Sequence, residues 1–339
     1  MPNFPRPGFH IVTLLVFLLV TAWACGPSDR EGSEADPGDA GAPPLEGADP
    51  DSRPGEDSRG GVQPQTYSLF GDPLFQMEDT TGAIAEADAA LAEDPGNVER
   101  IIAAGRIRRN FWQYRQAMEL YTRAIELAPE DWRPYRYRGH RHISLREFDA
   151  AVADLERARS LAPLNWDVAY HLGLAYYLSG RFQDASAEYR RCLGLAQDPV
   201  ARAASGDDFR SCSRNGDDPE SRVAMTEWAV RAALRAGQEE EVVKLLQEIP
   251  TDLDVEENVA YYHDLLFYKG LMTEEEILNP GPHAPYRRET VGYGVANWIL
   301  THGDTTRAIT LLEELARDPW WPGFGRVASE ADLVRLTGK

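Results

Sequence analysis

Small and apolar residues recur with a period of 34 residues across 98–197. The recurring sets are Gly105, Gly139 and Gly173; Ala117, Ala151 and Ala185; Tyr114, Phe148 and Phe182; Tyr121, Leu155 and Tyr189; and Ala124, Ala158 and Cys192. Each period predicts two helices, the first with a glycine at the point of close approach and the second with an apolar stripe at i, i+4 spacing. Pro129 and Pro163 end two of the second helices. Because one helix pair cannot bury its own apolar face, the pattern predicts a stack of pairs, an all-α solenoid.

Helical patterns continue on both sides of these three units, with less regular spacing. Upstream, residues 82–95 predict one more second helix with a short element around 67–75 as its partner, so the repeat region covers 67–197. Residues 198–221 are polar and predict a linker or an inserted loop. Residues 222–339 predict divergent helix pairs at 222–236 and 239–248, 259–268 and 274–278, and 290–301 and 306–317. Trp320, Trp321 and Phe324 precede a final helix at 327–336, which we expect to cap the stack.

The Gly, Ala, aromatic and Pro positions of the 34-residue units resemble the tetratricopeptide repeat family, with three full repeats over 98–197. The resemblance implies an α-solenoid that acts as a scaffold for protein partners. Arg108, Arg138 and His142 depart from it, since the family prefers aromatic or apolar residues there. The stretches TVGYGVANW and ASEADLVRL near the C-terminus are similar to the tail of bacterial repeat lipoproteins of uncharacterised function.

The N-terminus predicts export. A basic start, an apolar run at 11–20 and Ala22-Trp23-Ala24 describe a signal peptide over residues 1–24. The apolar run is shorter than the roughly 20 residues that span a bilayer. Cys25 resembles the acylated cysteine of a bacterial lipoprotein, and Gly26 after it favours the outer membrane, facing the periplasm. The alternative is cleavage by ordinary signal peptidase, which leaves a soluble periplasmic or secreted protein.

A polar segment follows the predicted lipidation site. Residues 26–66 contain fifteen Gly or Pro and ten Asp or Glu, but almost no large apolar side chain. Such a composition cannot bury enough apolar surface to offset the entropy lost on ordering, so residues 25–66 are predicted to be a disordered tether.

Charge is distributed unevenly along a chain whose formal net charge is -20. Residues 98–165 carry 13 basic and 9 acidic side chains, whereas 26–66 carry 3 and 10, and 197–339 carry 15 and 26. The repeat register places a basic and aromatic set of first-helix residues on the concave groove: Arg106, Arg109, Arg133, Arg136, His140, Tyr170 and Tyr177. One interpretation is a groove for an acidic peptide, since arginine binds carboxylates bidentately. The other is that these arginines are solvated or pair locally with Glu99, Asp131 and Glu147.

Several other functional classes are disfavoured. The exported, acidic chain has no base-reading module, so no nucleic-acid partner is expected. His140 and His142 lie two residues apart, about 200° around a helix, and no ligand-type residue at suitable spacing accompanies either, so no metal is expected. Glycine-rich phosphate loops and local catalytic motifs are absent, so neither a cofactor nor enzymatic activity is predicted.

Cysteine usage leaves one pairing open. With Cys25 lipidated, Cys192 and Cys212 remain in an oxidising compartment, where they form a disulfide or stay as two thiols.

The predicted function is therefore a membrane-anchored adaptor of the bacterial cell envelope. Its partner is an envelope protein or peptide held in the basic groove. The alternative is an accessory protein of polysaccharide or polymer export, or an envelope enzyme with its site in the divergent C-terminal half, where Trp320, Trp321 and Phe324 are candidates for stacking on sugars.

Overall fold

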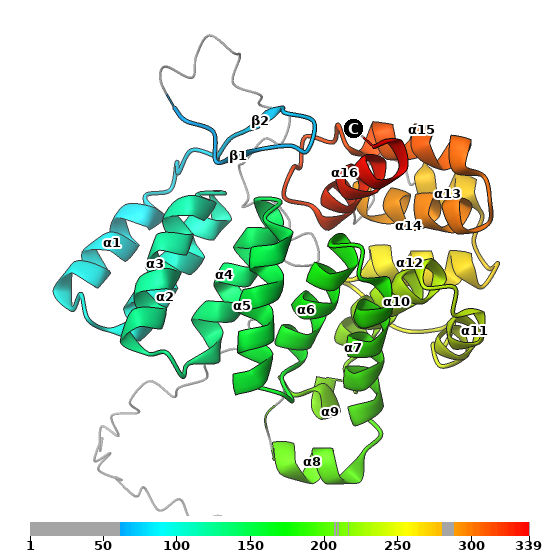
Figure 1. Cartoon of the computed structure of the whole chain (residues 1–339). Coiled ribbons are helices and arrows are strands. Elements are labelled where there is room, and N and C mark those ends of the chain that lie inside the picture. The colour runs from blue at the N-terminus through cyan, green and yellow to red at the C-terminus, as the bar shows by residue number, and fades with distance from the viewer. Residues whose placement is uncertain (1–61, 207, 209, 216, 280–287, 339) are drawn as a thin grey trace, which may run out of the picture. The chain divides into compact units, whose positions relative to one another are not determined.

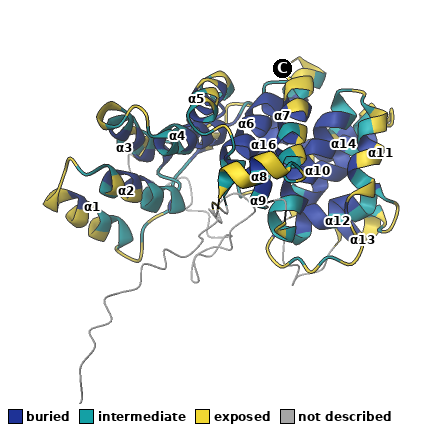
Figure 2. Ribbon diagram, turned by 90° about the horizontal axis from the view of Figure 1, so that it is seen from below, coloured by how far each residue is buried: buried dark blue, intermediate teal, exposed yellow. Residues whose placement is uncertain are grey.

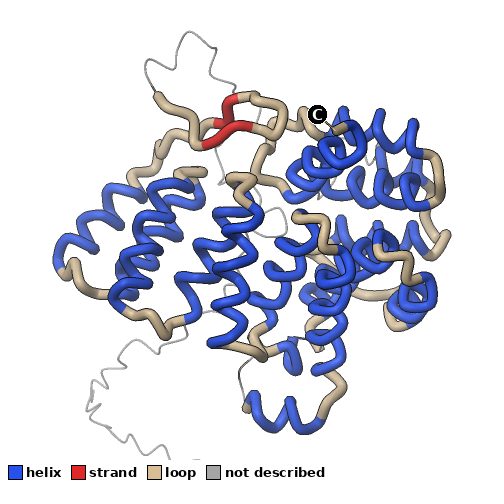
Figure 3. The backbone as a smooth tube through the Cα atoms, in the orientation of Figure 1, coloured by secondary structure: helices blue, strands red, loops and turns tan. Residues whose placement is uncertain are grey.

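A computed structural model describes residues 62–338 except 207, 209, 216 and 280–287. The described part is helical apart from two short antiparallel strands, β1 (Thr66–Tyr67) and β2 (Pro73–Leu74) (Figures 1 and 3). The helices up to the third repeat are α1 (Ala83–Glu93), α2 (Val98–Asn110), α3 (Tyr114–Leu127), α4 (Trp132–Ser144), α5 (Phe148–Leu161), α6 (Trp166–Leu178) and α7 (Phe182–Leu195). The predicted all-α solenoid is confirmed.

Each 34-residue unit is a pair of helices packed through its glycine. A Cβ atom on Gly105 would lie 2.5 Å from the ring of Tyr121, and one on Gly173 would lie 2.4 Å from the ring of Tyr189. These distances are far below van der Waals contact, so only hydrogen fits at this position of the first helix. The aromatic ring of the second helix fills the space instead.

The turn between successive units is also repeated. Asn97, Asp131 and Asn165 are N-caps of α2, α4 and α6, and each side chain accepts a hydrogen bond from a backbone N–H of the first helical turn. A side-chain cap of this kind stabilises a helix by about 1 kcal/mol. The caps and glycines therefore set the start and the pairing of all three units, and prolines end the first two.

The stack continues beyond the third repeat through further helix pairs. They are α10 (Pro219–Arg235) with α11 (Glu239–Gln247), α12 (Val259–Tyr268) with α13 (Glu274–Leu278), and α14 (Arg288–Thr301) with α15 (Thr305–Leu315), followed by α16 (Phe324–Thr337). Helix α10 packs on α7, and α16 packs on α14 and α15 as the expected cap. No helix in the described part of the chain is both long and apolar enough to cross a bilayer.

The short element expected at 67–75 is a β-hairpin, since Pro73 cannot lie in a helix interior and Gly71 adopts a positive φ of 89°. The polar segment at 198–221 is not a simple loop. It contains α8 (Pro199–Ser205) and α9 (Cys212–Asn215), of which α9 packs against α7.

The cap helix α16 has a second set of neighbours. Besides α14 and α15 it contacts α4 and α6, which are first helices of the second and third repeats. Figure 2 shows the buried residues gathered on α6, α10, α14 and α16, whereas α1 and α8 remain largely exposed. One buried core therefore joins the second and third repeats to the C-terminal helices.

Candidate functional site

The first helices of the repeats carry a row of paired charges. Glu99, Arg133 and Asp167 occupy the same position in three successive units. Arg133 binds Glu99 through Nη1 at 2.8 Å and also its own N-cap Asp131 at 2.7 Å. Arg136 of α4 binds Asp167 of α6 at 2.5 Å. The local pairing of Arg133 with Glu99 and Asp131 is the alternative that the sequence left open.

Arginine and tyrosine side chains interleave beside this row. The guanidinium carbons of Arg106 and Arg136 lie 6.0 Å and 5.1 Å from the ring centre of Tyr137. Tyr137 in turn stacks on Tyr121 at 5.5 Å. Both arginines are therefore within range of a cation–π interaction with one ring.

Positive charge is concentrated in the same place. Arg141 lies 4.7 Å above the ring of Tyr114. Burial, together with the positive charges of Arg141 and Arg136, lowers the pKa of Arg109 to about 10. An anionic group placed among these guanidinium groups would offset their mutual repulsion. We call Arg106, Arg109, Arg136, Arg141 and Tyr137 the arginine cluster.

The predicted groove residues fall into two groups. Arg106, Arg109 and Arg133 remain partly exposed. Arg136, His140, Tyr170 and Tyr177 are only 0%, 2%, 1% and 0% exposed. This burial corrects the expectation that all seven line an open surface. Only the part of the groove on α2 and the start of α4 is accessible to a partner in this conformation.

The chain's own C-terminal segment covers the buried group. Phe324, the first residue of α16, lies 5.3 Å from the ring of His140 and 6.4 Å from that of His171. Tyr177 lies deeper, where its hydroxyl donates to Asn297 of α14. Trp321 and Phe324 are buried as well, so they are not placed to stack on a sugar at the surface.

Three turn residues with the 34-residue spacing hold this segment. Trp112, Arg146 and Gly180 each follow a first helix, and all have positive φ, of 57°, 66° and 78°. A left-handed backbone costs a non-glycine residue roughly 1–2 kcal/mol. Glycine in the third repeat shows that the turn itself requires no side chain.

The side chains at these turns contact residues near the C-terminus. Trp112 packs edge-on against Trp320 at 4.9 Å and Trp321 at 5.6 Å. The Nε and Nη2 atoms of Arg146 donate to the carboxylate of Glu330 at 3.0 and 2.7 Å. Gly180 lies against the side chain of Arg335, to which an added Cβ would approach within 3.7 Å. The strained residues in two of the three turns therefore serve the contact with the C-terminal segment.

The structure also accounts for the polar residues that depart from the family pattern. Arg138 of α4 binds Asp154 of α5 bidentately, with both distances 2.7 Å, and Thr122 of α3 at 3.0 Å. His142 contacts Glu147 at 2.7 Å. Arg108 of α2 binds Asp88 of α1 at 2.6 Å. Each replaces an apolar contact between helices with an ion pair or hydrogen bond.

A second charged cluster lies in the C-terminal half, and the sequence reasoning missed it. Arg231 of α10 binds Glu227 on its own helix, and its Nη2 lies 2.9 Å from Asp264 of α12. All three side chains are completely buried. The i, i+4 spacing of Glu227 and Arg231 was the only signal in the sequence, and on a surface helix that spacing is ordinary.

Burial governs the ionisation of this cluster. It raises the pKa of Glu227 from 4.5 to about 7, against the opposing effect of the Arg231 charge. It raises the pKa of Asp264 in the same direction. Two carboxyls share one guanidinium, so the folded chain favours holding a proton here at neutral pH.

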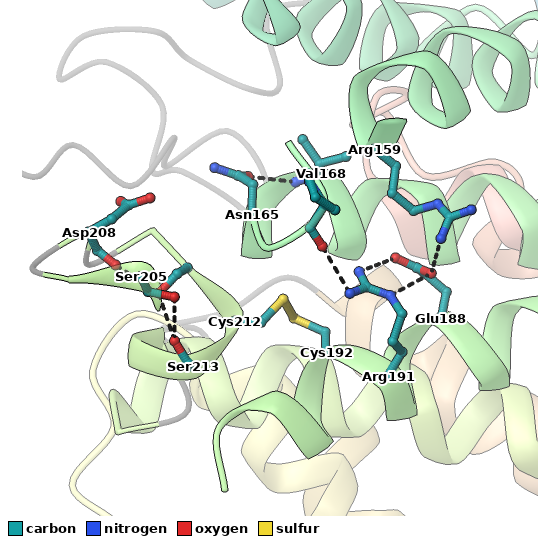
Figure 4. The surroundings of a disulfide bond; sticks show 12 residues. Arg159, Asn165, Val168, Glu188, Arg191, Cys192, Ser205, Asp208, Cys212 and Ser213 are labelled. Carbon is teal, nitrogen blue, oxygen red and sulfur yellow. Dashed lines mark hydrogen bonds and ion pairs between the residues drawn. A yellow bond between two sulfur atoms is a disulfide. The ribbon is translucent and has the colours of Figure 1, made fainter. Parts of the chain in front are cut away.

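Cys192 of α7 and Cys212 of α9 are joined by a disulfide, with their Cα atoms 5.1 Å apart (Figure 4). The bond ties the inserted segment to the third repeat. Close by, the backbone N–H of Cys212 donates to Leu164 at 2.7 Å, and that of Trp166 donates to Arg210 at 2.8 Å. Among the described residues, no group of three potential ligands is arranged to hold a metal ion.

Known proteins resemble the repeats of this chain. Residues 138–201 match the family described as Tetratricopeptide repeat. Small glutamine-rich tetratricopeptide repeat-containing protein 2 of Saccharomyces cerevisiae is 34% identical over 94 residues, which is 28% of this chain and 27% of the relative. BBSome complex member BBS4 of Bos taurus is 30% identical over 98 residues, 28% of this chain and 18% of the relative. The chain thus spans less than a third of either protein.

Two solved structures give likenesses of the same kind. MamA is 20% identical with a TM-score of 0.39, covering 56% of this chain and 84% of that one. YrrB, described as a TPR protein with an unusual peptide-binding site, is 15% identical with a TM-score of 0.39, covering 70% and 94%. The repeat type found at residues 138–201 generally forms scaffolds for protein–protein interaction, with the concave side as binding surface.

Proposed function

We propose that this protein is a lipid-anchored adaptor of the bacterial cell envelope that holds an acidic segment of a partner protein on the arginine cluster. The observation that carries the proposal is the gathering of guanidinium groups on α2 and α4, two of them beside the ring of Tyr137. Guanidinium groups form bidentate, charge-assisted bonds with carboxylates, and Tyr137 adds an aromatic platform beside them.

Exposure supports a partner at the α2 end of the groove. Arg106, Arg109, Arg133 and Tyr137 are all partly exposed, with the Nε and Nη1 atoms of Arg109 buried, and Ala103 of α2 is exposed and small. A small residue lets an extended peptide approach the helix closely. The proposed ligand is therefore an extended acidic segment that runs across α2 and α4.

Reversing the charge of the accessible arginines is expected to abolish partner capture. In cells that produce the protein, the triple variant Arg106→Glu, Arg109→Glu, Arg133→Glu should lower the yield of the dominant crosslinked envelope protein at least about tenfold. Each lost charge-assisted hydrogen bond is worth about 1.5–3 kcal/mol. Arg136 is left intact because it is buried and paired with Asp167.

A matched variant separates this effect from a change in net charge. Arg157→Glu, Arg181→Glu and Arg190→Glu reverse three exposed arginines outside the arginine cluster. We expect crosslinking of this variant to stay at the wild-type level, with circular dichroism unchanged in both. Equal yields from the two variants would rule out Arg106, Arg109 and Arg133 as the residues that bind the partner.

The anchor is tested independently. Cys25 and the predicted signal peptide lie outside the described residues, so the proposal rests on the sequence alone. We expect the Cys25→Ala variant to move from the membrane fraction to the soluble periplasmic fraction, because without the thiol no acyl chain can be attached. Ser28→Ala, a change three residues away, should leave the protein in the membrane. A membrane-bound Cys25→Ala protein would contradict lipid anchoring.

A further inference from the structure

Helix α16 contacts α4 and α6 of the second and third repeats, and its residues from Phe324 to Leu333 are buried. We call residues 320–335 the C-terminal latch. Its contacts with the repeats include polar and aromatic pairs: Glu330 with Arg146 at 2.7 Å, Arg335 with the carbonyl of Leu178 at 2.8 Å, and Phe324 with His140 and His171. Trp321 also joins an apolar cluster with Leu145. The N-terminal hairpin joins the same contact, since the backbone N–H of Leu69 donates to Glu330 at 3.1 Å.

A solvent-open recess of about 360 Å³ lies beside this interface, where the latch, the hairpin and the repeat turns meet. It is lined by Leu69, Arg146, Phe148, Leu178, Ala331 and Arg335, among others. On the opposite side, α16 approaches α14 so closely that a Cβ on Gly325 would lie 2.0 Å from the backbone oxygen of Glu289. The latch is thus packed tightly on α14, and an open recess borders its contact with the repeats.

The latch also occupies the continuation of the candidate groove. Phe324 covers His140 and His171, and Arg136 beside them is an arginine-cluster residue whose neighbours on α2 are still accessible. Arg136 therefore lies between the part of the concave side that Phe324 covers and the part on α2 that is exposed. A ligand that extends from α2 toward α6 meets Phe324.

We propose that the C-terminal latch is an autoinhibitory element that occupies the concave groove of the second and third repeats. When the groove opens, the latch separates from α4 and α6. Opening exposes His140 and His171, so that a partner on the arginine cluster gains surface that Phe324 otherwise covers. The identification of this contact as inhibitory rests on the proposed partner groove. The opening itself is a property of the chain alone and is measurable without a partner.

The test uses hydroxyl-radical footprinting of the full chain, which reports the exposure of individual side chains. The variant is Trp112→Gly with Arg146→Gly, since both positions are left-handed turns in which the third repeat has glycine. Glu330 keeps Arg326 at 3.0 Å and the Leu69 N–H, so no buried carboxylate is left without a partner. We expect oxidation of Trp321, Phe324 and His140 to rise at least about tenfold, because the lost charge-assisted bonds shift the opening equilibrium by that factor or more.

Two references make the outcome decisive. Trp228 is fully buried away from the interface, so its oxidation should not change. Arg157→Ala, which removes an exposed arginine of α5, should leave every reading at the wild-type level. Unchanged oxidation of Trp321 and Phe324 in the glycine variant would overturn the proposal, and so would an equal rise at Trp228, which indicates general unfolding. Opening without any partner on the arginine cluster would refute the proposed function and leave the latch standing.

Discussion

Replacing Arg231 with methionine is expected to lower the free energy of unfolding by about 3–5 kcal/mol at pH 8. Arg231 is the partner of both Glu227 and Asp264, and none of the three side chains is exposed. Without the guanidinium, two carboxyls remain in the core with no opposite charge, and each must take up a proton or ionise in a medium of low polarity. Urea unfolding followed by circular dichroism measures the loss.

An exposed ion pair serves as the control for Arg231. Arg307 binds Glu274 with side chains 55% and 30% exposed, so Arg307→Met should change the unfolding free energy by less than about 0.5 kcal/mol. Adding Glu227→Gln and Asp264→Asn to Arg231→Met should restore part of the lost stability. If Arg231→Met and Arg307→Met have the same small effect, the buried cluster does not stabilise the fold.

The same cluster makes stability depend on pH. Because burial raises the pKa of Glu227 from 4.5 to about 7, the folded chain binds more protons than the unfolded chain between these values. The free energy of unfolding therefore falls as pH rises from about 4.5 toward 7, and Asp264 contributes in the same direction. In Glu227→Gln this dependence should be weaker, which unfolding curves at pH 5 and pH 8 would reveal.

Reducing the Cys192–Cys212 disulfide should lower the free energy of unfolding by about 3 kcal/mol. The disulfide closes a loop with a sequence separation of 20, and its loss frees the unfolded chain to adopt more conformations. Both sulfurs are buried against α7, so the reduced protein also has to accommodate two thiols in the same space. Urea unfolding with and without a reducing agent measures the difference.

The double variant Cys192→Ala, Cys212→Ala is the control for the disulfide. It should unfold at lower urea than the oxidised wild type, and a reducing agent should not shift its midpoint further. Two hydrogen bonds, from Cys212 to Leu164 and from Trp166 to Arg210, should keep the inserted segment near the third repeat after reduction. If the oxidised wild type is no more stable than its reduced form, other contacts hold the two cysteines together and the disulfide adds no stability.

The repeats were predictable from the sequence because their determinants are local and recur. Gly105 and Gly173 face the rings that the 34-residue register assigns to them, and Pro129 and Pro163 follow the helices that they end. Arg138 and His142 could not be interpreted in the same way. Their partners, Asp154 and Glu147, lie on or just before the next helix, and nothing in the period marks those acids as interior residues.

The register predicted which helices carry the candidate site, but not which of its side chains are accessible. Arg106, Arg109 and Arg133 lie on the first helices α2 and α4 and are partly exposed. It could not reveal that Arg136, His140, Tyr170 and Tyr177 are buried. These side chains are covered by α10, α12, α14 and α16. The sequence predicts these helices, but it does not predict the direction in which the stack of helix pairs curves.

The sequence by itself therefore determined the helix pairs, their order and their stacking. These depend on contacts between neighbouring units, and neighbouring units are close in the chain. Tertiary structure alone decided which surface of the stack is open. Arg146 and Glu330 are 184 residues apart, and their contact exists only because the small rotations between successive helix pairs bring α16 back onto α4 and α6. Such rotations accumulate from the packing of every pair, so no short stretch of sequence records their sum.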